Sequence, residues 1–138
     1  MKRPVSLRDL DKEVSTLWDR LPPGGVVWLQ GELGTGKTTF VTKLAESVGA
    51  SGAGSPSFSL VHSYDSPEGV IFHADCYRLK APEEARDMDL STLAARGRAL
   101  LIEWPEKGGA HVPKPTAVVH FEHIGDPDAR LIEVSFWE

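Results

Sequence analysis

One eight-residue segment constrains the fold more than any other: Gly31-Glu32-Leu33-Gly34-Thr35-Gly36-Lys37-Thr38. It fits the pattern G-x-x-x-x-G-K-[ST], in which the backbone N–H groups of a glycine-rich loop bind phosphate. The apolar run before it predicts a buried strand over residues 26–30. Apolar residues at helical spacing after it predict a helix over residues 37–48. The pattern therefore lies between a strand and a helix, as a phosphate-binding loop (P-loop) must.

Each position in this loop has a chemical reason. Glycine allows positive φ and lets the backbone come close to phosphate oxygens. The N–H groups then form an anion site at the amino end of the helix. We expect the Lys37 ammonium to contact the β- and γ-phosphates of a nucleotide and the Thr38 hydroxyl to ligate Mg²⁺. The candidate nucleotide-binding residues of this segment are Gly31, Leu33, Gly34, Thr35, Gly36, Lys37, Thr38 and Thr39.

The rest of the sequence predicts a single α/β domain over residues 1–138, of the P-loop NTPase type. We expect a mixed central sheet with some antiparallel strands, flanked by helices. A helix is predicted over residues 6–21, with Ser6 and Asp9 as a capping box. A flexible loop is expected over residues 51–56, and a helical region over residues 82–96 that is broken near Asp89. Further strands are predicted over residues 57–64, 70–75, 99–103, 116–123 and 130–137.

Two carboxylates follow apolar strands and are candidates to complete the site. Asp75 ends residues 70–75, and Glu103 ends residues 99–103. The carboxyl ends of parallel strands open onto the ligand crevice of such a sheet, so both can converge there. One would supply the Mg²⁺ shell and the other would orient water, and the sequence leaves open which does which. The competing interpretation is a solvated carboxylate at a strand end.

Other residues carry weaker signals. Arg78 and Arg130 could stabilise a transferring phosphate, although exposed surface arginines are commoner. Trp104 fits the core and the nucleotide pocket equally well. The single cysteine, Cys76, excludes an internal disulfide and is most simply a small buried residue.

The charge and hydropathy patterns exclude several classes of protein. A net charge of -5 without a basic cluster argues against direct binding of nucleic acid. The apolar runs are too short for a signal peptide or a membrane span. We therefore expect a cytoplasmic protein with no membrane partner.

With these residues in view, the chain resembles the TsaE family, also called the YjeE family, of small bacterial P-loop ATPases. The resemblance rests on four ordered motifs: GELGTGKTTF (Gly31–Phe40), SPSFSLVHSY (Ser55–Tyr64), HADCYRL (His73–Leu79) and LIEWPE (Leu101–Glu106). It implies that Ser55–Phe58 is a switch-like loop, with Ser57 in place of the usual threonine. It also implies that Asp75 and Glu103 act around Mg²⁺ and in hydrolysis, and that Trp104 lies near the nucleotide. Cys76 replaces the usual leucine.

The resemblance implies an Mg²⁺-dependent ATPase that is weak alone and serves tRNA threonylcarbamoyladenosine modification. It would reset or license a complex of the TsaB–TsaD type, and tRNA would be met only through that complex. A different class remains possible on the sequence: a small-molecule or nucleotide kinase with residues 78–98, including Arg86 and Arg96, as a lid. A third interpretation is a non-catalytic nucleotide switch, with Asp75 and Glu103 only structural.

Overall fold

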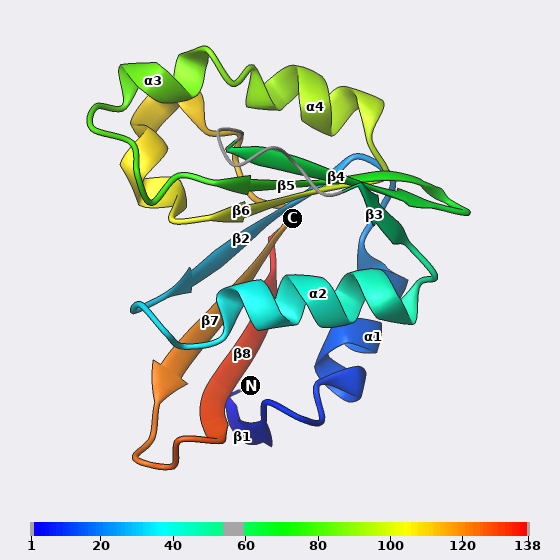
Figure 1. Cartoon of the computed structure of the whole chain (residues 1–138), viewed down its shortest axis with the longest axis vertical. Helices are drawn as coiled ribbons and strands as arrows, with labels where there is room; N and C mark the ends of the chain where they lie inside the picture. Colours follow the sequence, from blue (N-terminus) through cyan, green and yellow to red (C-terminus); the bar gives the residue numbers. More distant parts are fainter. Residues whose placement is uncertain (1, 54–59, 138) are drawn as a thin grey trace.

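The computed structural model describes residues 2–53 and 60–137. Within them, eight strands form one sheet in the order β1-β8-β7-β2-β6-β5-β4-β3 (Figure 1). The strands are β1 (Arg3–Ser6), β2 (Gly25–Gly31), β3 (Ser51–Ala53), β4 (Val61–Ser66), β5 (Gly69–Asp75), β6 (Ala99–Glu103), β7 (Ala117–His123) and β8 (Ala129–Phe136).

The centre of the sheet is parallel and its two margins are antiparallel. Strand β2 pairs in parallel with both β6 and β7, and β5 pairs in parallel with β6. The pairs β1–β8, β7–β8, β4–β5 and β3–β4 are antiparallel. The predicted mixed sheet is confirmed, and β6 is buried along its whole length: four apolar residues, as expected of a central parallel strand, and Glu103 at its end.

Helices cover the two faces of the sheet (Figure 1). Helices α1 (Asp11–Arg20) and α2 (Lys37–Ser47) lie on one face, while α3 (Glu83–Arg86), α4 (Leu90–Arg96) and the 3₁₀ helix η1 (Pro105–His111) lie on the other. Each face has its own apolar core. The larger core includes Leu17, Phe40 and Phe121, and the smaller one includes Leu90 and Ile102. Packing in the two cores keeps the carboxyl ends of β5 and β6 beside the start of α2.

The prediction for the amino-terminal segment was partly wrong. A helix was expected from Ser6, but Ser6 ends β1 and α1 begins only at Asp11. Ser6 makes a turn instead, since its carbonyl accepts the Asp9 N–H at 3.0 Å. The apolar stripe begins at Leu7 in the sequence, but Val5 pairs with Arg130 of β8. Pairing of a short edge strand thus overrides the local helical pattern.

The other predicted elements differ mainly at their ends. Residues 51–53 form β3 against β4, where the sequence indicated a loop, and β4 extends to Ser66. The expected break near Asp89 is confirmed: its φ of 51° separates α3 from α4. The remainder of the predicted loop 51–56 and the first three residues of the predicted strand 57–64 lie outside the described residues.

In the part of the chain that the structure describes, every helix is too short or too polar to cross a lipid bilayer.

Candidate functional site

The phosphate-binding loop joins β2 to α2, as the sequence predicts. Gly36 has a φ of 102° and directly precedes α2, whose first residue is Lys37. Gly31 has a φ of 155°, and a Cβ atom there would lie 2.7 Å from the carbonyl oxygen of Phe121. Both positions therefore need glycine, because a larger side chain would meet backbone strain and a neighbouring atom. The loop therefore begins close against Phe121 of β7.

Lys37 is turned inward at the base of the loop and is 4% exposed. Its Nζ atom donates a hydrogen bond to the carbonyl of Gly31 and lies 3.7 Å from the ring centroid of Trp104. Burial lowers the pKa of Lys37, while the negative charges of Glu103, Glu106 and Asp75 oppose this shift. The ammonium thus has a backbone acceptor and an aromatic face as its neighbours.

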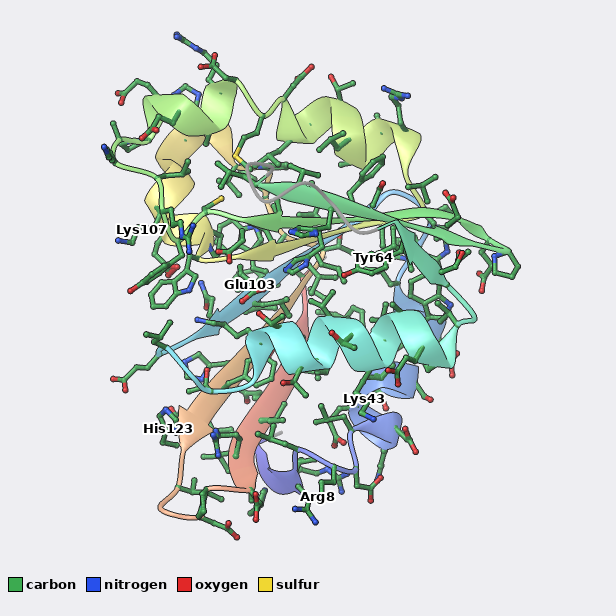
Figure 2. All side chains as sticks on the ribbon, viewed as in Figure 1. Arg8, Lys43, Tyr64, Glu103, Lys107 and His123 are labelled. Carbon is green, nitrogen blue, oxygen red and sulfur yellow. The ribbon has the colours of Figure 1, made fainter. Side chains whose placement is uncertain are left out.

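Glu103 is the centre of a buried polar network at the end of β6. The residue is only 3% exposed, and its side chain points toward the amino end of α2 (Figure 2). The Thr38 hydroxyl donates to its carboxylate, at 2.9 Å from Oε2 and 3.1 Å from Oε1. Nε2 of His73, on β5, lies 2.6 Å from the same Oε2. The two predicted residues, Thr38 and Glu103, are therefore in direct contact.

The network also determines the charge of Glu103. Burial is the largest single influence and raises its pKa, but other contributions outweigh it. Those are the hydrogen bond and charge of His73, the hydrogen bond of Thr38 and the charge of Lys37. The pKa of Glu103 consequently lies below its usual value, and the group is an anion at neutral pH.

Asp75 lies opposite Glu103 in the parallel register of β5 and β6. It is half-buried, and its Oδ1 accepts the N–H of Tyr77 at 3.0 Å. A cavity of about 280 Å³ brings both carboxylates together with the loop. Of the residues that the sequence singles out, it is lined by Leu33, Gly34, Gly36, Lys37, Thr38, Thr39, Asp75, Glu103 and Trp104.

Two predicted loop residues lie on the other side of the loop. Gly31 and Thr35 line an adjoining cavity of about 670 Å³, which Trp104 also borders. Thr35 is buried, and its hydroxyl donates to the Glu32 carbonyl at 2.7 Å, so its side chain stabilises the loop itself. Ser57 lies outside the described residues. The smaller cavity carries the carboxylates and the lysine, so we take it as the chemical site.

The donor atoms of the smaller cavity fit a magnesium ion. The Thr38 hydroxyl and the carboxylates of Asp75 and Glu103 are hard oxygen ligands, which Mg²⁺ prefers. Within the described ranges no three His, Cys, Asp or Glu side chains are grouped as a metal site. A cation held here would therefore take part of its shell from water and from the phosphates of a nucleotide, as Mg²⁺ usually does.

The sequence interpretation missed one residue near the site. His73 precedes Asp75 by two positions, so both side chains belong to the same face of β5, a signal that could have been used. Arg130 was a candidate to stabilise a transferring phosphate, with an exposed surface arginine as the commoner alternative, but it is 7% exposed and donates a hydrogen bond to the P-loop. Arg78, Arg86 and Arg96 are exposed, and none of them lines the smaller cavity. Cys76 is buried, as predicted.

The loop, its flanking strand and helix, and the contact from Thr38 to a carboxylate at a strand end define a P-loop NTPase. The fold agrees with a crystal structure of Bacillus subtilis YdiB: the TM-score is 0.72 at 22% identity, covering 99% of this chain and 86% of that one. The family model described as "Threonylcarbamoyl adenosine biosynthesis protein TsaE" matches residues 5–132. The chain therefore belongs to the TsaE family.

Individual relatives give the same result. A Rickettsia bellii protein is 36% identical over 83% of this chain and 80% of its own length. A Haemophilus influenzae protein is 36% identical over 79% of this chain and 68% of its own. A Bacillus subtilis protein is 29% identical over 79% of this chain and 68% of its own. All three are named tRNA threonylcarbamoyladenosine biosynthesis protein TsaE.

Proposed function

We propose that this protein binds and hydrolyses ATP with Mg²⁺, and that it thereby resets or licenses the transferase complex of tRNA threonylcarbamoyladenosine biosynthesis. The contact between Thr38 and Glu103 carries the ATPase part of this proposal. It places a hydroxyl, a carboxylate anion and the Lys37 ammonium around one cavity at the start of α2. Phosphoryl transfer is catalysed mainly by such positioning and by charge stabilisation.

The residues of the cavity have different roles in binding and hydrolysing ATP. The backbone of the loop and Lys37 bind the phosphates, and Trp104 borders the site from the β6 side. Thr38, Asp75 and Glu103 hold Mg²⁺, which when bound neutralises the charge that develops on the phosphates. Between them, the two carboxylates hold this ion and orient the attacking water. His73 fixes the rotamer of Glu103 through its 2.6 Å contact.

The place in tRNA modification follows from membership of the TsaE family. We propose a partner complex of the TsaB–TsaD type, in the cytoplasm, with tRNA reached only through that complex. The net charge of -5 supports an indirect role, because a protein that grips tRNA itself needs a basic surface. Ser57 belongs to the segment that we expect to respond to the γ-phosphate.

ATP turnover tests this function against the kinase alternative. The purified chain is assayed with and without its partner complex, and separately with a panel of phosphate acceptors. We expect slow release of inorganic phosphate alone and faster release with the complex. Stoichiometric phosphorylation of an acceptor, without stimulation by the complex, would replace the proposal by a kinase. Binding of ATP without any turnover, with or without the complex, would leave a nucleotide switch.

A further inference from the structure

A buried arginine lies on the side of the P-loop away from the carboxylates. Arg130 is the second residue of β8, where it pairs with Val5 of β1, and it is 7% exposed. One nitrogen of its guanidinium group donates to the carbonyls of Asp126, Pro127 and Ala129, at 3.2, 3.1 and 2.7 Å. The other terminal nitrogen donates to the carbonyl of Gly34 in the P-loop, at 3.0 Å. The guanidinium thus joins two loops that are 96 positions apart in the sequence.

These partners are unusual for a buried cation. Among residues 2–53 and 60–137, no carboxylate forms an ion pair with Arg130, and its buried Nε has no hydrogen-bond partner. Burying a charge without a counter-charge is costly. Three of its hydrogen bonds stay within four residues of Arg130, and only the bond to Gly34 reaches a distant part of the chain. The bond to Gly34 is the one that needs a long, forked side chain.

We propose that Arg130 is a positioning residue of the nucleotide site, which holds the P-loop in its phosphate-binding conformation through the Gly34 carbonyl. This inference rests on the proposed function, since it assigns a role in ATP binding. Arg130 is not among the residues that line the smaller cavity, so it acts through the loop rather than on the phosphates directly.

The geometry of the peptide group explains how such a bond acts. In a planar trans peptide the C=O and N–H groups point in opposite directions. Arg130 draws the Gly34 carbonyl outward, toward β8, which fixes the plane of the Gly34–Thr35 peptide. The Thr35 N–H makes only a long bond to the Glu32 carbonyl, at 3.3 Å. Without Arg130 this peptide would be free to rotate, because glycine on one side of it allows many conformations.

The same hairpin supports the neighbouring peptide. Nε2 of His123, the last residue of β7, lies 3.4 Å from the carbonyl of Leu33. Figure 2 shows His123 beside the loop, at the carboxyl end of β7. The β7–β8 hairpin therefore contacts two consecutive carbonyls of the loop. Their outward direction leaves the inner surface of the loop to N–H groups, which is what an anion site requires.

ADP affinity, measured by titration calorimetry with Mg²⁺, tests the proposal without depending on hydrolysis. Wild type is compared with Arg130→Met and Arg130→Lys. We expect Arg130→Met to bind ADP about tenfold more weakly, since a hydrogen bond from a charged donor is lost. Arg130→Lys should fall between the two, because one ammonium can reach the Gly34 carbonyl but cannot reproduce the fork. It also preserves the charge if Arg130→Met fails to fold.

Arg98→Met is the control for the loss of a buried arginine far from the loop. Arg98 donates to the carbonyl of Pro22 and, unlike Arg130, also pairs with a carboxylate, that of Glu68. It precedes β6, at the opposite end of the strands. Replacing a purely structural arginine would lower the melting temperature and the fraction of protein that can bind. The Kd for ADP of the folded fraction would stay unchanged. We expect that result for Arg98→Met only.

The outcomes separate this inference from the function on which it rests. If wild type binds ADP and both Arg130 variants match its Kd, the positioning role is wrong and the ATPase proposal stands. The role is equally wrong if Arg98→Met weakens binding as much as Arg130→Met does. If wild type itself does not bind ADP or ATP, both proposals fall together.

Discussion

The two strands beside β2 serve the P-loop in different ways. On one side, β6 and its parallel neighbour β5 end in Glu103 and Asp75, and their side chains face the cavity. On the other side, β7 and β8 form a hairpin whose Arg130 and His123 contact the carbonyls of the loop. The first side offers groups that can act on phosphate and Mg²⁺. The second side contacts only the outside of the loop.

The phosphate site therefore has two parts: a chemical half at the ends of β5 and β6, and a supporting half in the β7–β8 hairpin. Groups of the chemical half must be charged and reach the cavity, so their removal should affect the reaction first. Groups of the supporting half should affect affinity first, because they set the shape of the loop before nucleotide arrives.

Glu103→Gln is expected to have the largest effect. The amide keeps the size of the side chain but removes the anion beside Thr38, so single-turnover hydrolysis should fall by about 100-fold or more. ADP affinity should change much less. Asp75→Asn is its companion, and the variant that needs more Mg²⁺ identifies the carboxylate that contributes more to holding the metal. Hydrolysis at the parental rate in both variants would show that the chemical half is misassigned.

Lys37→Ala should come next, and its effect should be on binding. Of the cationic side chains in residues 2–53 and 60–137, only that of Lys37 lines the smaller cavity, and it can leave the Gly31 carbonyl for phosphate oxygens. Loss of such charge-assisted bonds should weaken ATP binding by about 100-fold. Calorimetry measures this directly, with Lys43→Ala as the control. Lys43 is a half-exposed residue further along α2, paired with Glu46. Unchanged affinity in Lys37→Ala would contradict the assignment of the loop.

His73→Phe tests whether the buried network is needed to hold Glu103. Phenylalanine fills the space but leaves the Glu103 carboxylate without its 2.6 Å partner. The cost should be about 2 kcal/mol of unfolding free energy, the usual penalty for a buried charged group that loses a hydrogen bond. Urea unfolding measures this free energy. His120→Phe is the control, because His120 is a half-exposed residue of β7. Equal stabilities for the two variants would mean that His73 does not support Glu103.

The pH dependence of stability should show the smallest effect. The pKa of Glu103 is lower in the folded protein than in the unfolded chain, so its ionised form favours folding. That contribution is present above the unfolded pKa of about 4.3 and is lost as the pH falls through the lower, folded value. As the pH is lowered, the free energy of unfolding of wild type should therefore fall relative to that of Glu103→Gln. A difference independent of pH between 7 and 3 would contradict the lowered pKa.

The sequence predicted that the loop and the two carboxylates would gather at one end of the sheet, and their cavity agrees with this, while their roles stay predictions. It did not predict the contacts of the β7–β8 hairpin with the loop. Lys37 and Thr38 belong to a motif, and Asp75 and Glu103 end apolar strands, so the parallel topology alone brings them together. Arg130 has no such signal, because its role depends on the approach of a distant hairpin to the P-loop. His73 shares a face with Asp75, but only the packing of β5 against β6 shows that it contacts Glu103.

The beginning of the chain was misread for a related reason. Val14 and Leu17 are buried on α1, and Leu10 and Leu21 are buried at its two ends, as the apolar stripe predicts. The stripe also includes Leu7, which instead lies against Gly36 of the P-loop, where a Cβ atom would be 2.8 Å from Leu7 Cδ2. Periodicity alone cannot distinguish a helical residue from one that packs against a loop.

The division between the two halves is tested most directly by measuring two quantities on two variants: the ATP Kd and the single-turnover rate at saturating ATP, for Glu103→Gln and Arg130→Met. We expect Glu103→Gln to lose mainly rate. Arg130→Met should lose mainly affinity, with its saturating rate reduced by less than its binding. If both variants lose the same quantity to the same extent, the P-loop has no separate supporting half, and the account is wrong.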